Sequence, residues 1–283
     1  MNKFILSFIT ILSFANNYAQ DVAAEKYTAH NKGKFFVFWG GNRGVFANSD
    51  ITFKGENYDF TVENAVADDK PKGFHIDYLN PARMTIPQTN FRMGYFISDK
   101  YSVSIGVDHM KYVVRQFQTF NVNGTINLPT TEIGSAFNGI YLNKPTLMSD
   151  EFLKFEHTDG LNYVHVEIAR QDDVSNWFNL PNIDKFQINL NEGFGTGFIY
   201  PRTDSTLLGK PRQDDYHVSG FGVSLKAGLN FTFFKHFFIQ TELKTGYLNM
   251  YDIKTTYTND DMATQKIIFF ERTLAFGGIF KFK

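Results

Sequence analysis

The sequence has no cysteine among its 283 residues, and its formal net charge at pH 7 is only −1. Without cysteine the chain can form no disulfide, and a lipid anchor on a cysteine after an export signal is excluded as well. The balanced charge leaves no basic footprint, so we expect no nucleic acid partner. The sequence also lacks any run of about 18 consecutive apolar residues, so we expect no membrane-spanning helix.

Aromatic residues, in contrast, are abundant: the chain contains 32 Phe and 14 Tyr. A soluble domain rarely uses so many. The wall of a membrane β-barrel does use them, because aromatic side chains form girdles at both membrane interfaces. The composition therefore favours a barrel wall.

The first residues have the pattern of an export signal. A start that carries Lys3 precedes a short apolar stretch over residues 4–14, and we expect cleavage after Ala19. A buried amphipathic first helix is the alternative interpretation. We predict three segments: a signal peptide (1–19), a periplasmic amino-terminal segment (20–33) and an outer-membrane β-barrel (34–283).

Alternation of apolar with polar or small residues predicts about eight strands. It is clearest over residues 217–233, where every second residue from Phe221 to Phe231 is apolar and the residues between them are small or polar. The expected strands cover residues 34–46, 89–98, 101–118, 161–170, 186–200, 217–233, 237–251 and 267–282.

The connections between these strands alternate in length. Short links at Asp99, near Asn182 and at Lys235 alternate with long ones over residues 47–88, 119–160, 201–216 and 252–266. Short periplasmic turns and long extracellular loops produce this asymmetry, whereas a soluble β-sandwich does not require it. We therefore predict an all-β fold, a transmembrane antiparallel up-and-down β-barrel of about eight strands in the cell outer membrane. The stretch 48–61 is expected to form a β-hairpin above the membrane, as a binding surface or as a cap.

An eight-stranded barrel has an interior that side chains just fill. Because unpaired charges inside it are costly, we expect inward-pointing ionisable residues to form a lumen charge network of mixed sign. Two roles are open for this network, a polar plug that sets strand register and a narrow path for protons or small ions. By alternation, its members are Arg92, Asp108, His165, Glu167, Lys226, Glu242, Lys244 and Glu271.

His217 and Ser219 lie two residues apart at the extracellular end of a strand, and we expect both on its outward face. A His that activates a Ser hydroxyl is the core of a nucleophilic acyl-transfer site. No acid that would orient His217 is evident from the sequence. The pair therefore supports only an alternative function, and interfacial polar residues are the other interpretation.

Two further patterns do not indicate a cofactor or a metal site. Gly193, Gly195 and Gly197 follow a two-residue period, so they give the lumen space on one strand face and do not form a phosphate loop. Acidic pairs at 68–69, 214–215 and 260–261 lie in expected loops, where they would bridge lipopolysaccharide phosphates through divalent cations or simply be solvated. Their spacing does not match a calcium-binding loop.

The carboxyl end carries Gly277, Phe280 and Phe282. With the export signal and the eight-strand layout, it resembles small outer-membrane barrels of the OmpA/OmpX type, in a form similar to those of Bacteroidetes. The resemblance implies that these three residues are the signal for the barrel-assembly machinery, although Ala275 and the extra Lys283 depart from the usual pattern. We expect no peptidoglycan-binding domain after the barrel.

Two functions from different classes follow from these patterns. The first is a barrel with a closed lumen and a structural or surface-interaction role in the cell envelope. Its expected partners are outer-membrane lipid, lipopolysaccharide and an envelope protein complex. The alternative is a lipid A or phospholipid acyl hydrolase that uses His217 and Ser219.

Overall fold

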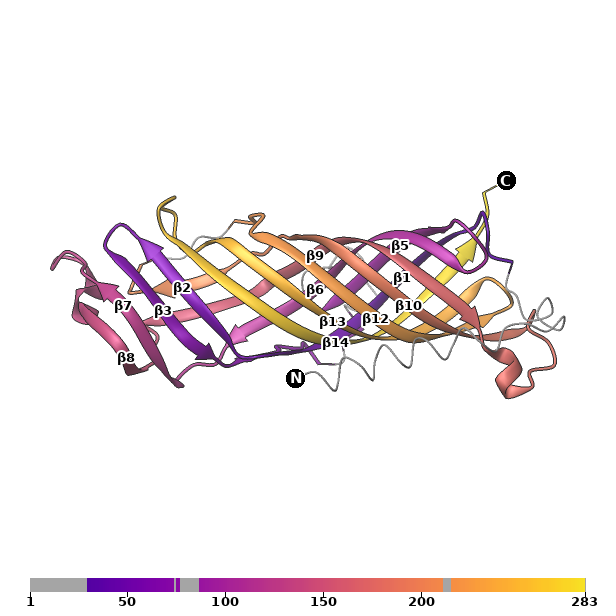
Figure 1. Ribbon diagram of the computed structural model, residues 1–283, viewed down its shortest axis with the longest axis horizontal. Coiled ribbons are helices and arrows are strands. Elements are labelled where there is room, and N and C mark those ends of the chain that lie inside the picture. Colours follow the sequence, from indigo (N-terminus) through magenta and orange to yellow (C-terminus); the bar gives the residue numbers. More distant parts are fainter. Residues whose placement is uncertain (1–29, 74, 77–86, 211–214, 283) are drawn as a thin grey trace.

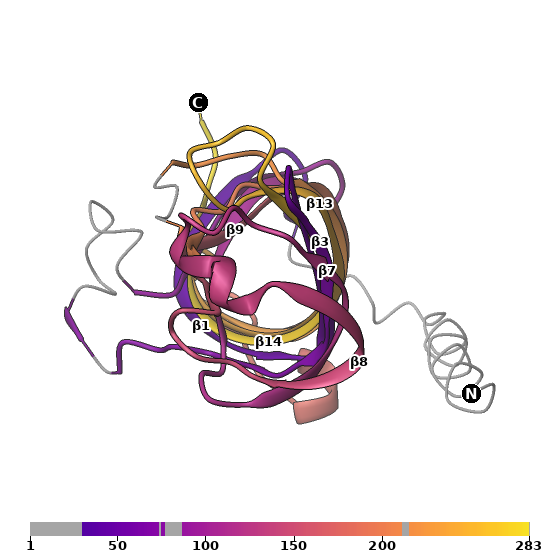
Figure 2. The same ribbon diagram turned by 90° about the vertical axis from the view of Figure 1, so that its left-hand side faces the viewer.

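The computed structural model describes residues 30–73, 75–76, 87–210 and 215–282. Eight strands close into a ring in the order β1, β5, β6, β9, β10, β12, β13 and β14, because β14 pairs back onto β1 (Figures 1 and 2). Their bounds are β1 Phe35–Phe46, β5 Thr89–Phe96, β6 Tyr101–Val114, β9 Leu153–Asp173, β10 Phe186–Ile199, β12 Gly220–Phe233, β13 Phe237–Lys254 and β14 Met262–Phe280.

The ring is strongly staggered. When directly paired residues are followed once around it from Phe35, the path returns to β1 at Val45, ten residues further along. Such a stagger tilts the strands by roughly 35–45° from the barrel axis. In a ring of eight strands this geometry leaves an interior that side chains fill.

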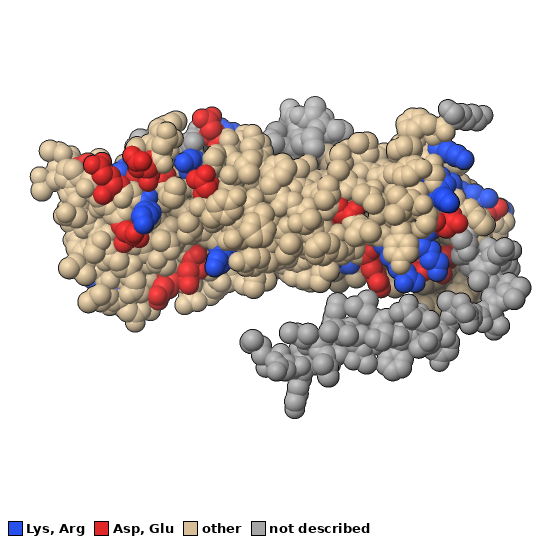
Figure 3. All heavy atoms as spheres, turned by 45° about the horizontal axis from the view of Figure 1, so that its top comes forward, with Lys and Arg blue, Asp and Glu red and all other residues tan. Residues whose placement is uncertain are grey.

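The outer surface of the ring is apolar. On β14, Phe270, Leu274 and Phe276 are exposed, whereas Glu271 and Thr273 between them are buried. Figure 3 shows Lys, Arg, Asp and Glu gathered towards the two ends of the visible face, with a band between them that is almost free of these residues. An apolar outside around a polar inside is typical of a lipid-facing wall. The predicted fold, an eight-stranded transmembrane up-and-down β-barrel, is confirmed.

All eight predicted strands are present, with different ends. β9 begins at Leu153, where 161 was expected, and β14 begins at Met262, where 267 was expected. β12 begins later than expected, at Gly220. Near the first residues of β9 and of β14 the inward side chains are apolar as well, such as Phe155 and Ile267. The alternation that marks the membrane part is therefore lost there.

Four further strands extend the sheet beyond the ring. They follow the upper part of β14 in the order β2 (Ser49–Gly55), β3 (Tyr58–Ala65), β7 (Thr119–Ile126) and β8 (Gly139–Leu147). We call these strands and the residues packed on them the crown; it lies at the left of Figure 1. The hairpin expected over 48–61 is β2–β3. Two short strands, β4 (Ala67–Asp68) and β11 (Asp204–Leu207), pair with β6 and β9.

The crown has a hydrophobic core of its own. Phe53, Phe60, Phe152 and Phe155 are fully buried. Their rings lie within 5.3–5.7 Å of one another in successive pairs. A one-turn 3₁₀ helix at Ile133–Phe137 packs against this core through Phe137.

The opposite end of the ring carries the short turns, a second 3₁₀ turn at Ser175–Phe178 and the end of β14. We call it the turn end. The expected signal peptide (1–19) lies outside the described residues, as do most residues of the segment 20–33. In the part of the chain that the structure describes, no helix is long and apolar enough to cross a membrane.

Candidate functional site

All eight residues predicted for the lumen charge network lie inside the ring, and none is more than 8% exposed. They come from six of the eight ring strands. Lys226 of β12 is the direct partner of Lys244 on β13, which in turn is the direct partner of Glu271 on β14. The alternation of the sequence therefore predicted correctly which face of each of these strands points inward.

Asp108 of β6 is the centre of the network. Its carboxylate accepts a hydrogen bond from Arg92 Nη1 at 2.8 Å and from Lys244 Nζ at 2.5 Å. His165 Nε2 lies 3.1 Å away, and Asn90 Nδ2 donates at 2.6 Å. One buried anion on β6 thus holds side chains from three other strands, β5, β9 and β13.

Lys226 forms the second centre, towards the turn end. Its Nζ lies 2.7 Å from Glu167 and 2.5 Å from Glu242. Arg92 Nη2 joins the two centres, because it lies 3.5 Å from Glu167. Glu271 differs from the other carboxylates, because its hydrogen-bond donors are neutral: Asn90 Nδ2 at 2.8 Å and Thr273 Oγ1 at 3.0 Å.

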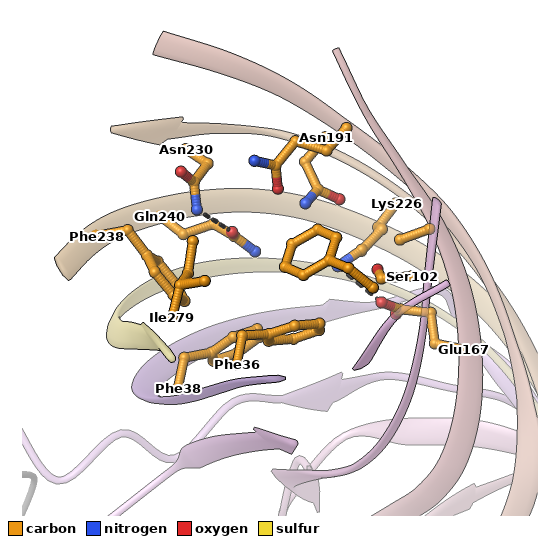
Figure 4. A pocket seen from close by; sticks show the side chains of 13 residues that line it. Phe36, Phe38, Ser102, Glu167, Asn191, Lys226, Asn230, Phe238, Gln240 and Ile279 are labelled. Carbon is orange, nitrogen blue, oxygen red and sulfur yellow. Dashed lines mark hydrogen bonds and ion pairs between the residues drawn. The ribbon is translucent and has the colours of Figure 1, made fainter. Parts of the chain in front are cut away.

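A small cavity lies beyond the network at the turn end. Figure 4 shows Asn191 above the rings of Phe36 and Phe38, with Asn230 and Gln240 hydrogen-bonded beside it. The cavity has about 20 Å³ for the centre of a water molecule, room for roughly one or two waters. An aromatic cluster closes this end of the interior: Phe36, Phe38, Phe96, Phe238, Ala275 and Ile279.

The crown core reaches into the other end of the ring. Leu161, Tyr163, Leu248 and Phe269 belong to ring strands, yet they are buried in the same cluster as Phe53 of the crown. The interior therefore has three layers: the aromatic cluster, the charge network and the apolar core. The third layer was not predicted, because it depends on loops that fold back over the barrel.

The expected outward position of Ser219 is wrong. Ser219 is fully buried, whereas Phe221, two residues further along the chain, is 46% exposed. The alternation breaks at this point, since Ser219 and Gly220 are both buried, and β13 bulges opposite, where the amides of Tyr251 and Asp252 both donate to the Ser219 carbonyl oxygen. The residues before Gly220 therefore do not occupy the faces that alternation assigns to them.

His217 has an acidic partner that the sequence did not reveal. Its Nε2 lies 2.7 Å from Asp252 Oδ2. Burial alone would raise the pKa of Asp252, but the hydrogen bond from His217 and the charges of His217 and Lys254 hold it below its usual value. The Ser219 hydroxyl, however, donates to the backbone carbonyl of His217 at 3.4 Å. The structure thus contains an Asp–His pair, and the hydroxyl is not directed at the imidazole.

The terminal residues of the expected assembly signal lie at the seam between β14 and β1. Phe280 is the direct partner of Phe35, and Phe282 packs edge-on against Phe35 with ring centres 5.1 Å apart. Gly277 faces inward, where a side chain would collide with Phe38 and Phe238. Their recognition by the assembly machinery stays a prediction.

Two of the loop acids, Asp68 and Asp261, are held by side chains of the protein itself. Arg115 binds Asp68 at 2.7 Å and lowers its pKa, and Asp261 accepts from Thr256 at 2.8 Å and from Lys210 at 3.2 Å. Asp214 lies outside the described residues. Among those described, no group of three or more His, Asp or Glu residues could hold a metal ion. A side chain at Gly195 would press on Ser224, so that glycine does leave space in the lumen.

The outermost strand of the crown, β8, differs from the strands beside it. Its described residues pair only with β7, so its other edge is open. Ile140 and Leu142 on its outer face are 73% and 82% exposed. Sequence reasoning did not find this strand, although it expected structure in the loop.

No family model matches the chain, and no curated protein matches it. Among solved structures it is similar to Ail, the attachment invasion locus protein of Yersinia pestis, at 11% identity and a TM-score of 0.34, covering 88% of this chain and 99% of Ail. It is also similar to the outer membrane protein OprG from Pseudomonas aeruginosa (11% identity, TM-score 0.36, 90% and 99% covered). A third is the outer membrane protein AlkL in lipid bilayers (11%, 0.41, 94% and 97%).

The chain resembles small outer-membrane β-barrel proteins. The class expected from the sequence agrees with this resemblance. At this level of identity the likeness concerns the fold alone, so the function has to be argued from the residues of this chain. An origin in Bacteroidetes stays a prediction.

Proposed function

We propose that this protein is an exported outer-membrane barrel with a closed lumen, whose crown is displayed outside the cell and docks an extended segment of another envelope protein. The observation that carries the proposal is the open edge of β8. An unpaired strand edge presents free backbone donors and acceptors to which another strand can add. The docked segment forms an additional strand of the crown sheet.

The outer faces of the neighbouring strands support this choice of surface. Thr52 of β2 and Thr61 of β3 share a hydrogen bond at 2.8 Å, and Asn123 of β7 donates to Glu63 at 2.8 Å. Polar side chains therefore cover these three strands, whereas β8 exposes Ile140 and Leu142. Exposed apolar side chains confined to an open edge are typical of an interaction site.

The charge of β8 narrows the chemistry of the partner. Its single charged residue is Lys144, whose Nζ lies 5.0 Å from the centre of the Tyr141 ring. A segment that alternates apolar residues with an acid opposite Lys144 would cover both features. Peptides of this pattern are the partner class that we propose.

The filled interior supports the closed lumen. Three layers of buried side chains follow one another along the axis, and the charged layer is paired within itself. We expect the purified protein in a planar bilayer to give no stepwise ion conductance. Discrete conductance steps would contradict the closed lumen and leave docking at β8 untouched.

A photo-reactive residue at Leu142 tests docking in living cells, with the same residue at Lys54 on the outer face of β2 as control. We expect a discrete adduct from position 142 and none from position 54. An adduct of twice the protein's mass would identify a second copy as the partner. The same adducts from both positions, or none from either, would refute docking at β8.

The alternative function, a lipid acyl hydrolase, has one supporting observation, the His217–Asp252 pair. The buried position of Ser219 weighs against it. Mass spectrometry of lipid A and phospholipids from cells that carry Ser219→Ala tests it directly. If lipids lose an acyl chain in cells with the original protein but not in cells with Ser219→Ala, the protein is a hydrolase.

A further inference from the structure

We infer that strand addition to β8 is confined to its first half, residues 139–142, and that the docked segment is therefore a short extended peptide. The inference rests on docking at β8, the function proposed above. It specifies which part of the edge binds and through which groups. The second half of the edge, residues 143–147, is closed by Asn143 and Pro145.

The pairing of β7 shows which main-chain groups of β8 point to the open edge. The Asn127 amide, directly after β7, donates to the carbonyl oxygen of Asn57, directly before β3. Successive residues of a strand in an antiparallel sheet face alternate neighbours, so the even-numbered residues of β7 face β8. The register joins these residues to four residues of β8, whose main-chain groups therefore face β7: Gly139, Tyr141, Lys144 and Thr146.

In the first half, the groups that point outward belong to Ile140 and Leu142. An added strand can form hydrogen bonds with the N–H and C=O of both residues. Two such residues in a row are enough to pair with a segment of about four residues. The exposed side chains of Ile140 and Leu142 then lie beside those of the added strand, where apolar neighbours stabilise the pairing.

The second half of the edge lacks these donors. The Asn143 amide donates to Oδ1 of Asn123 on β7 at 2.7 Å, so it is not available to a partner. Pro145, at the next outward position, has no N–H. Proline on an exposed edge prevents further pairing. β8 also bends here, because Asn143 has a φ of 51° and the register with β7 shifts. An added strand therefore ends at Asn143.

The open half is held firmly at its start. Oδ1 of Asn138 accepts from the Leu128 amide, and its Nδ2 donates to the Leu128 carbonyl oxygen, both at 2.8 Å. Tyr141 is buried, and its hydroxyl donates to the Phe137 carbonyl oxygen at 2.7 Å. An edge that is already ordered loses little conformational entropy when a strand docks. The first half is thus prepared for binding.

Lys144 lies directly beyond the open half. A segment whose main chain pairs with Ile140 and Leu142 brings its next residues beside Lys144. Opposite charges on adjacent strands stabilise the pairing, so an acid at this position of the segment is favoured. The partner class is thereby narrowed to peptides that carry a short apolar extended stretch with an acid at one end.

Photo-reactive residues at Leu142 and at Leu147 test the confinement in living cells. Leu142 and Leu147 are 82% and 55% exposed and belong to the same strand, so position 147 is a matched control on the closed half. We expect a discrete adduct from position 142 and none from position 147. Equal adducts from both positions would refute the confinement. If neither position gave an adduct, docking at β8 itself would be refuted.

Ile140→Pro, combined with the photo-reactive residue at 142, tests the main-chain pairing. It removes the outward N–H and keeps the groups that face β7, as Pro145 does in the original strand. The adduct should fall about fivefold or more, as expected when one neutral hydrogen bond is lost. Ile140→Val keeps the N–H and should leave the adduct unchanged. Unaltered resistance of the crown to proteolysis verifies that Ile140→Pro folds. An undiminished adduct in Ile140→Pro would refute main-chain pairing and leave docking through side chains intact.

Discussion

The ring and the crown belong to one continuous sheet, yet their polarity is opposite. In the ring the outside is apolar and the inside carries ion pairs, whereas in the crown the outside carries Thr, Asn and charged residues around an aromatic core. The change occurs within single strands. On β14 the outward residues pass from Lys266 to Phe270 while the inward residues pass from Ile267 to Glu271.

This reversal shows that the surrounding solvent, and not the strand itself, sets the pattern of side chains. Water around the crown makes burial of Phe53 and Phe60 favourable. Lipid around the ring removes that driving force, because its tails are as apolar as a protein core. The ring has instead to pair the charged groups inside it, because an unpaired buried charge is costly.

The largest effect should come from the centre of the charge network. Asp108→Leu would leave Arg92 and Lys244 buried without their shared anion. Breaking a buried pair in this way costs about 5 kcal/mol, so we expect a much lower urea midpoint for the barrel in lipid vesicles. Ser104→Ala, also inward on β6, is the control and should change the midpoint little. A similar loss in both variants would mean that packing and not charge stabilises the ring.

A smaller and more local effect should come from the crown core. Phe152 is fully buried, with the rings of Phe137 and Phe60 at 5.2 and 5.7 Å. Phe152→Ala should cost about 3 kcal/mol through the cavity that it leaves. We expect rapid proteolysis of the crown while the ring keeps its heat-modifiable migration on a gel. The exposed Phe117 offers the matched control, Phe117→Ala; unfolding of ring and crown together would show that the two regions are one cooperative unit.

The sequence was sufficient to predict the ring and the eight inward ionisable residues, because a two-residue period carries that information locally. Lys226 and Glu242, for example, each fall on the inward face of a clearly alternating strand. The rest depends on contacts between distant segments. Asp252 lies beside His217, and Ser219 is buried, at the point where β13 bulges between Met250 and Ile253. A bulge of this kind shifts which face each residue occupies.

The crown was harder to predict for the same reason. β2–β3 follows from local alternation, but β8 is recognised only through its pairing with β7. Its exposed Ile140 and Leu142 resemble a loop when they are viewed along the sequence. The site that we propose for docking was therefore missed, whereas the charge network was found.

The smallest effect, and the one that separates crown from ring most finely, is expected from pH. His157 is fully buried in the crown, where its Nδ1 lies 3.0 Å from Thr203 Oγ1 and its ring packs against Phe155. Burial lowers the pKa of His157 from 6.5 to about 3. Between these values the unfolded crown binds a proton that the folded crown excludes, so stability falls as the pH drops below about 6.5 and is unaffected above it.

At pH 5 the loss should be about 2 kcal/mol. This loss of crown stability is measured by hydrogen exchange of the amides of β7 and of the crown part of β9 at pH 7.5 and 5.0, corrected for the intrinsic exchange rate. In His157→Gln the difference between the two pH values should largely disappear, because the replaced side chain does not titrate. Exchange of amides in the turn-end half of β13 should be the same at both pH values, in the original protein and in His157→Gln. If acid loosened β13 as much as β7, titration inside the ring, and not the crown histidine, would be responsible.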